Sequence, residues 1–179
     1  PGASRATTTR RVRANPGGTG WIKCDANYVT SALAKREAEK AGFIESIFLD
    51  AREGRYIEEG SSCNIFAVLR DGRLVTPSLE DTILPGITRA SVLELAREAG
   101  IRTEERRVAV AEVMAEATEL FATGNAAGVT FFESLTHDGR TATFGTGAIG
   151  PVAQRLLRTL KGIQYGLLED TRGWMVSAA

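Results

Sequence analysis

Apolar side chains recur at helical spacing in four parts of this 179-residue chain, and each part predicts a helix. Asn27 is the expected cap of the first helix, which stops at Gly42. The second follows the turn at 84–89, and the last begins at Pro151, because proline is favoured in a first helical turn. The predicted helices cover about 27–41, 87–99, 110–115 and 151–163.

Short apolar segments between these helices predict strands. Asp71-Gly72 and Asp138-Gly139 are turn residues that join neighbouring strands into hairpins. The predicted strands cover 21–24, 44–49, 56–58, 64–69, 74–76, 101–108, 119–123 and 129–132. Hairpins interrupted by helices, without a regular βαβ repeat, predict a mixed α/β fold with α+β character.

The composition is that of one ordinary globular domain and excludes several classes of protein. Hydrophobic residues make up 43% and charged residues 25% of the chain, which is enough for a real core. The 22 basic and 22 acidic residues balance, so we expect neither nucleic acid nor a membrane surface as a partner. No apolar run approaches the roughly 20 residues of a membrane helix and no signal peptide is evident, which predicts a cytoplasmic protein.

Cysteine and histidine are too few for a metal site. Cys24 and Cys63 are the only cysteines and have no partners at metal-ligand spacing. They could form a pair, but two free thiols in a reducing cytosol are expected. His137 is the only histidine, so zinc enzymes and Ser–His or Cys–His hydrolases are poor candidates.

The first 22 residues differ from the rest of the chain. Residues 1–15 are basic and poor in apolar side chains, with four arginines and three consecutive threonines. This composition is typical of a linker or a loosely held strand. We therefore expect 1–22 to be an interdomain linker or loop, and 23–179 to form the folded domain.

The segment LPGITR at 84–89 is the first sign of chemistry. Pro85 and Gly86 force a turn into the helix that starts at Ile87. The first backbone N–H groups and the positive dipole end of that helix are therefore free to bind a phosphate, and Thr88 adds a hydroxyl. An ordinary loop-to-helix junction has the same pattern, so both interpretations stay open at this point.

Lysine is scarce, which narrows the search for an amine that could bind an aldehyde. The chain has only four lysines. Lys35 and Lys40 belong to a charged helix face, and Lys161 lies late in a helix, where a cation complements the dipole. Only Lys23 has both apolar and polar neighbours in the sequence. The alternative interpretation is that Lys23 is a surface lysine that follows a glycine-rich loop.

Several segments in register resemble one enzyme family. They are 22–28 (IKCDANY), 57–66 (IEEGSSCNIF), 84–89 (LPGITR), 161–166 (KGIQYG) and 173–175 (GWM). Together they resemble the fold-type IV aminotransferases, which use pyridoxal phosphate, and most closely the branched-chain amino acid aminotransferases. The resemblance extends from about Pro16 to about Met175. It implies that 23–179 is the pyridoxal-phosphate-binding large domain, a pseudo-barrel.

The resemblance also implies a role for each candidate residue. Lys23 would bind the cofactor aldehyde and then move the proton, and Glu59 would hold the ring nitrogen protonated. Glu58 would face away from the cofactor, because successive side chains of a strand point to opposite faces. Without the resemblance, Glu58 and Glu59 could equally be two solvated acids on an edge strand. Tyr28 would donate to the ring hydroxyl oxygen, or be an ordinary core tyrosine. Leu84 would pack against the ring, and Gly86, Ile87 and Thr88 would bind the phosphate. A second loop at 123–127 (TGNAA) would bring Gly124 and Asn125 to the cofactor. In the same loop, Asn125 and Ala126 would contact the substrate.

Two features depart from the family's pattern. In the family, the residue after this glycine is usually a threonine whose hydroxyl reaches the phosphate, whereas this chain has Asn125 after Gly124. The longer amide side chain would move the phosphate or intrude on the substrate. Such enzymes also carry a small domain before the lysine, and here only 22 residues precede Lys23. A lone large domain would expose apolar surface, so we expect a homodimer or a retained N-terminal fragment.

The activity implied by the resemblance is transfer of an amino group between a branched-chain or other hydrophobic amino acid and 2-oxoglutarate, as in amino-acid biosynthesis. D-amino acid transamination and aminodeoxychorismate lysis use the same lysine and glutamate and are alternatives. A further hypothesis is a domain that does not turn over by itself and serves as a binding or scaffold module, or as half of a split enzyme.

Overall fold

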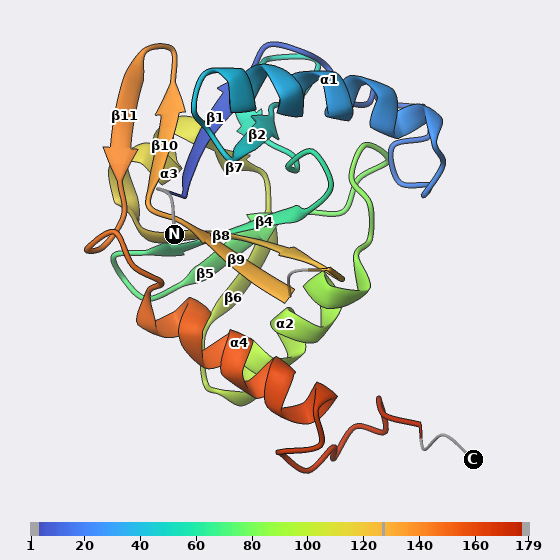
Figure 1. Ribbon diagram of the computed structural model, residues 1–179, viewed down its shortest axis with the longest axis vertical. Helices are drawn as coiled ribbons and strands as arrows, with labels where there is room; N and C mark the ends of the chain where they lie inside the picture. Colours follow the sequence, from blue (N-terminus) through green and yellow to red (C-terminus); the bar gives the residue numbers. More distant parts are fainter. Residues whose placement is uncertain (1–3, 127, 177–179) are drawn as a thin grey trace.

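The structure is a computed structural model that describes residues 4–126 and 128–176 (Figure 1). Its strands form a four-stranded sheet, a five-stranded sheet and a two-stranded pair, with helices on their outer faces. The elements are β1 (Arg5–Thr9), α1 (Ala26–Lys40), β2 (Glu45–Phe48), β3 (Tyr56–Ile57), β4 (Asn64–Leu69), β5 (Leu74–Pro77), α2 (Ile87–Glu98), β6 (Thr103–Arg106), β7 (Val108–Ala109), α3 (Val110–Glu116), β8 (Ala117–Gly124), β9 (Gly128–Phe132), β10 (Ser134–His137), β11 (Arg140–Thr143) and α4 (Pro151–Gln164).

The five-stranded sheet has the strand order β6-β5-β4-β8-β9. All six residues of β4 are buried, as is usual for a strand that is covered on both faces. On one face Phe66 stacks on its cross-strand partner Phe121, with ring centroids 5.3 Å apart, and α2 and α4 pack against this face (Figure 1). The opposite face turns Ile65 and Leu120 toward the core shared with the second sheet.

The four-stranded sheet, in the order β11-β10-β1-β2, places β1 between two parallel neighbours. Ala6, Ile47 and Leu135 come from three adjacent strands and are fully buried in the shared core. Helix α1 packs against β1 and β2. The two sheets are therefore held together by one apolar core, to which α3 adds Val110 and Val113.

The structure confirms the mixed α/β class and the four predicted helices to within a few residues. It also confirms the hairpin at Asp138-Gly139, which joins β10 to β11. Both turn residues have positive φ, 45° and 76°, the conformation for which an Asp-Gly pair is selected in two-residue hairpin turns. Among the described residues no helix is long and apolar enough to cross a membrane.

For residues 5–9 the structure favours the strand over the linker, the two interpretations given for residues 1–15. They form β1 at the interior of the four-stranded sheet. Its β-branched threonines suit a strand, but its pairing partners, β2 and β10, lie far along the chain, so local composition did not reveal its interior position. The domain boundary at residue 23 stays a prediction, and residues 1–3 and 177–179 lie outside the described part.

Two local predictions around the lysine are wrong. Residues 21–24 make turns rather than a strand, since the Ile22 N–H donates to the Thr19 carbonyl oxygen at 2.9 Å. Helix α1 begins one residue earlier than expected, and Asp25 rather than Asn27 occupies the cap position. The side chain of Asn27 instead binds the preceding loop, which matters for the site below.

Candidate active site

Loops next to α1, β4, α2 and β8 enclose a cavity of about 390 Å³. It is lined by nine candidate residues: Lys23, Tyr28, Glu59, Leu84, Gly86, Ile87, Thr88, Gly124 and Asn125. Ala126 lines an adjoining cavity of about 340 Å³, which shares Gly124 and Asn125 with the first. Ala127, the last residue of the TGNAA segment, lies outside the described residues. Segments that are distant in sequence therefore converge on one place.

Lys23 and Tyr28 form a pair at the cavity wall. Lys23 Nζ donates to the Tyr28 hydroxyl at 2.9 Å, and the Lys23 side chain is exposed to the cavity and solvent. The loop that carries Lys23 is fixed by Asn27, whose Nδ2 donates to the carbonyl oxygens of Thr19 and Ile22, both at 2.7 Å. Asn27 thus connects the start of α1 to the loop and restricts where the amine can lie.

Glu59 is a buried carboxylate held by Arg13 and by a backbone N–H group. Arg13 Nη2 donates to Glu59 Oε1, and both side chains are only 5% exposed. The Leu84 N–H donates to the same oxygen at 3.1 Å. The guanidinium also donates to the carbonyl oxygens of Gly20 (2.9 Å) and Thr82 (3.0 Å). Burial lowers the pKa of Arg13 from its ordinary value, and the negative Glu58 opposes that shift.

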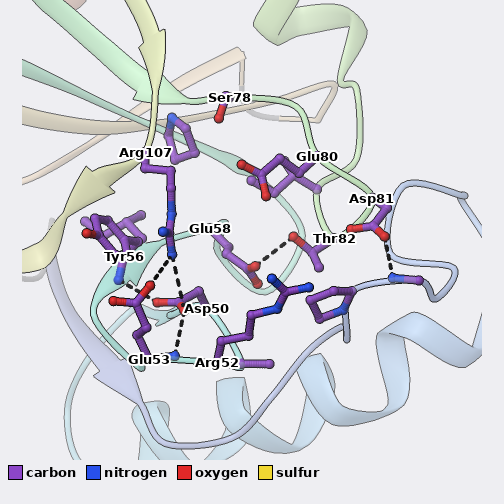
Figure 2. Close-up of a pocket in the computed structure, with 16 residues that line it drawn as sticks. Asp50, Arg52, Glu53, Tyr56, Glu58, Ser78, Glu80, Asp81, Thr82 and Arg107 are labelled. Atoms are coloured by element: carbon purple, nitrogen blue, oxygen red, sulfur yellow. Dashed lines mark hydrogen bonds and ion pairs between the residues drawn. The ribbon is translucent and has the colours of Figure 1, made fainter.

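Glu58 and Glu59 face different cavities, as expected for successive residues of an extended segment. Glu59 lines the cavity that contains Lys23, whereas Glu58 lines a separate cavity of about 480 Å³ (Figure 2). Glu58 accepts a hydrogen bond from the Thr82 hydroxyl at 2.7 Å there. Both acids are buried, so the alternative of two solvated acids on an edge strand is wrong.

The start of α2 forms the opposite end of the cavity. Gly86 occupies the cap position, and no side chain of the described residues caps the helix, so its first N–H groups lack the usual side-chain acceptor. A Cβ on Gly86 would collide with Asn64 Oδ1, so any larger residue there would displace the Asn64 side chain. Asn64 in turn donates to the Leu84 carbonyl oxygen at 2.9 Å and fixes the turn.

The Thr88 hydroxyl has a partner that the sequence pattern did not suggest. It donates to Asn125 Oδ1 at 2.8 Å, across from the second loop. Nearby, Thr123 Oγ1 is buried at the cavity wall and has no hydrogen-bond partner among the described residues. This end of the cavity therefore offers N–H and O–H donors, which suit an anionic group.

Comparisons with known proteins agree with this geometry. A family model described as amino-transferase class IV matches residues 2–135. The chain belongs to the class IV aminotransferase family.

Relatives of this class IV aminotransferase chain are named as branched-chain aminotransferases. One from Mycobacterium tuberculosis is 46% identical over 176 residues, with 94% of this chain and 48% of the relative covered. A mitochondrial one from Humulus lupulus is 44% identical over 164 residues, covering 92% and 41%. The solved Escherichia coli enzyme is 37% identical with a TM-score of 0.85, covering 95% and 54%. The chain thus spans about half the length of the relatives it matches.

Arg13 and Asn64 were not among the candidates in this class IV aminotransferase chain. Arg13 is one of four arginines in a basic segment, and nothing local distinguishes it from Arg10 or Arg11. Asn64 was quoted within the IEEGSSCNIF segment but was given no role. An arginine next to a glycine-rich loop and ahead of the lysine is the only signal that could have singled out Arg13.

Proposed function

We propose that this chain forms the cofactor-binding half of an enzyme that uses pyridoxal 5'-phosphate to exchange an amino group between a branched-chain amino acid and 2-oxoglutarate. The convergence of Lys23, Glu59 and the uncapped start of α2 on one cavity supports the proposal most strongly. The names of the relatives support the substrate class. Among the solved relatives, one structure contains pyridoxamine 5'-phosphate and another is complexed with 4-methylvaleric acid.

The donors of the cavity fit a phosphorylated pyridine aldehyde. The amine of Lys23 suits the aldehyde, and the buried carboxylate of Glu59 suits a protonated ring nitrogen. At the other end, the first N–H groups of α2 and the unpartnered hydroxyl of Thr123 suit a phosphate. When bound, pyridoxal phosphate supplies an electron sink for the electrons released at the substrate Cα.

Each residue then has a separate task. Lys23 holds the cofactor and later carries the proton to or from the substrate Cα, within reach of Tyr28, which orients its amine. Arg13 holds the Glu59 carboxylate, which would face the ring nitrogen. Leu84 would pack against the ring, and Ile87 and Thr88 would hold the phosphate through backbone N–H groups.

Absorbance spectroscopy on the purified chain tests the proposal. Addition of pyridoxal 5'-phosphate should give a visible band from a lysine-bound cofactor, and borohydride should fix the cofactor's mass on Lys23. Lys23→Ala should abolish the band, while the exposed Lys40→Ala should keep it. L-leucine should discharge the band and 2-oxoglutarate should restore it; D-leucine should do neither. A band that persists in Lys23→Ala would contradict the assignment.

The proposal includes a homodimer. Trp21, Ile22 and Ile87 are 52%, 41% and 76% exposed, and the two isoleucines line the cavity. Exposed apolar side chains grouped beside a site support an interface with a second chain. Light scattering should give at least twice the chain mass of 19.2 kDa, and a monodisperse monomer would contradict this part. A cytoplasmic location stays a prediction, since some relatives are named as mitochondrial or chloroplastic.

A further inference from the structure

A second cavity lies beside Glu58 and is separate from the proposed cofactor site (Figure 2). Its volume of about 480 Å³ falls within the roughly 300–1,000 Å³ typical of small-molecule sites. The walls come from the loop after β2, from β3, and from the segment that joins β5 to α2. Five carboxyl groups line it against two guanidinium groups, those of Arg52 and Arg107.

One wall of this cavity contains the guanidinium group of Arg107, which forms ion pairs there. Arg107 Nη2 lies 2.9 Å from Glu53 Oε1 and 3.6 Å from Asp50 Oδ2. The Arg107 Cζ also lies 3.7 Å from the ring centroid of Tyr56. Three backbone N–H groups, those of Glu53, Arg55 and Tyr56, donate to Asp50 and fix it in place. On this side one guanidinium therefore pairs with two carboxylates.

The acids of the other wall form no ion pair with a described residue, although the positive charge of Arg13 acts on Glu58. The Glu58 side chain is buried, with 7% of the residue exposed. One of its carboxyl oxygens accepts from the Thr82 hydroxyl, and the other has no hydrogen-bond partner in the described part of the chain. Glu80 and Asp81 lie near it at the exposed rim. Within residues 4–126 and 128–176, the ion pairs of the cavity are all made by Arg107, and none involves these three acids.

The unpartnered oxygen is the observation that points to a ligand. A buried polar atom that lacks a hydrogen bond costs about 1–3 kcal/mol, so a native protein seldom leaves one without a use. Burial raises the pKa of Glu58, and Asp50 and Glu80 raise it further, whereas the hydrogen bond from Thr82 and the charge of Arg13 lower it. A cation beside Glu58 would favour the charged carboxylate and supply the missing donor.

We propose that this cavity binds a small organic cation with a guanidinium group, which donates to the free oxygen of Glu58 and to Glu80 at the rim. A planar guanidinium matches a carboxylate with two parallel N–H donors, and Arg107 shows that the same cavity accommodates this group. A metal ion is the poorer occupant, because the described residues contain no group of three or more His, Cys, Asp or Glu arranged to hold one.

Calorimetric titration of the full chain tests this site with ethylguanidinium and its neutral analogue ethylurea. The two have nearly the same shape, and neither carries an amine that reacts with an aldehyde. Ethylguanidinium should bind saturably below about 10 mM, and ethylurea at least about tenfold more weakly. Equal binding of the two, or no binding of ethylguanidinium, would overturn the proposal.

Two variants locate the site. Glu58→Gln should weaken ethylguanidinium binding at least about tenfold, and the exposed Glu116→Gln should leave it within about twofold. Ser78→Trp fills the cavity while keeping Glu58, and should abolish binding even if Glu58→Gln fails to fold. Saturating pyridoxal 5'-phosphate should not compete. Competition, or unchanged binding in both cavity variants, would place the cation elsewhere and refute the site.

Discussion

Replacing Arg13 by methionine tests how the buried carboxylate of Glu59 is held. Arg13 donates to that carboxylate and to the carbonyl oxygens of Gly20 and Thr82, and both charged side chains are almost fully buried. Methionine keeps much of the volume but none of the donors. The carboxylate would retain only the Leu84 N–H, at 3.1 Å.

The expected cost is a large part of the stability of the domain. Removing one partner of a buried ion pair costs about 3–5 kcal/mol, and each carbonyl that loses its donor costs about 1–3 kcal/mol. These losses overlap, and water can enter from the cavity, so we expect Arg13→Met to lower the free energy of unfolding by about 4 kcal/mol. Adding Glu59→Gln removes the uncompensated charge and should restore about 2 kcal/mol.

Urea unfolding followed by circular dichroism measures both changes, with the exposed Arg52→Met as the matched control. The control should stay within about 0.5 kcal/mol of the parent chain. If the double variant is no more stable than Arg13→Met, the loss does not come from an unpaired buried charge. A loss below about 1 kcal/mol in Arg13→Met would refute the buried pair itself.

Three further predictions concern other groups. Burial raises the pKa of Glu58 above the ordinary 4.5, so the parent chain should lose stability relative to Glu58→Gln as the pH rises above 4.5. Urea unfolding of both proteins at about pH 5 and pH 8 measures this change. A stability difference that does not depend on pH would contradict the prediction. Asn125→Thr frees the Thr88 hydroxyl and should tighten pyridoxal 5'-phosphate binding about fivefold in an absorbance titration; weaker binding would contradict the role of this hydrogen bond. Glu119 accepts from the first N–H groups of α4 at 3.0 and 2.9 Å, so Glu119→Gln should cost about 1–2 kcal/mol in urea unfolding, with no change expected for Glu116→Gln.

Local patterns predicted those parts of the fold that local physics determines. The apolar spacing located α2 and α4 because each buries one stripe against the five-stranded sheet. Asp138-Gly139 predicted a hairpin because both residues tolerate positive φ. The candidate residues that line the cofactor cavity were found through their segments, since Lys23 and the turn at 84–89 carry recognisable neighbours.

The remaining features depend on contacts between distant segments. β1 has little apolar content of its own and is a strand because β2 and β10 pair with both its edges. Asn27 looks like a helix cap, yet its amide binds two loop carbonyls. Arg13 resembles the neighbouring arginines until the fold brings Glu59 against it. Polar groups of this kind have no periodicity, so only their burial and partners identify them.

Thr82 connects the two cavities and explains how two adjacent acids can both be buried. Its hydroxyl donates to Glu58, and its carbonyl oxygen accepts from Arg13, which pairs with Glu59. A single guanidinium therefore acts on both acids, by direct contact with one and by charge across a short distance to the other. The charge state of Glu58 consequently changes the field at the arginine that orients Glu59, so the two cavities are electrostatically coupled although they are separate sites.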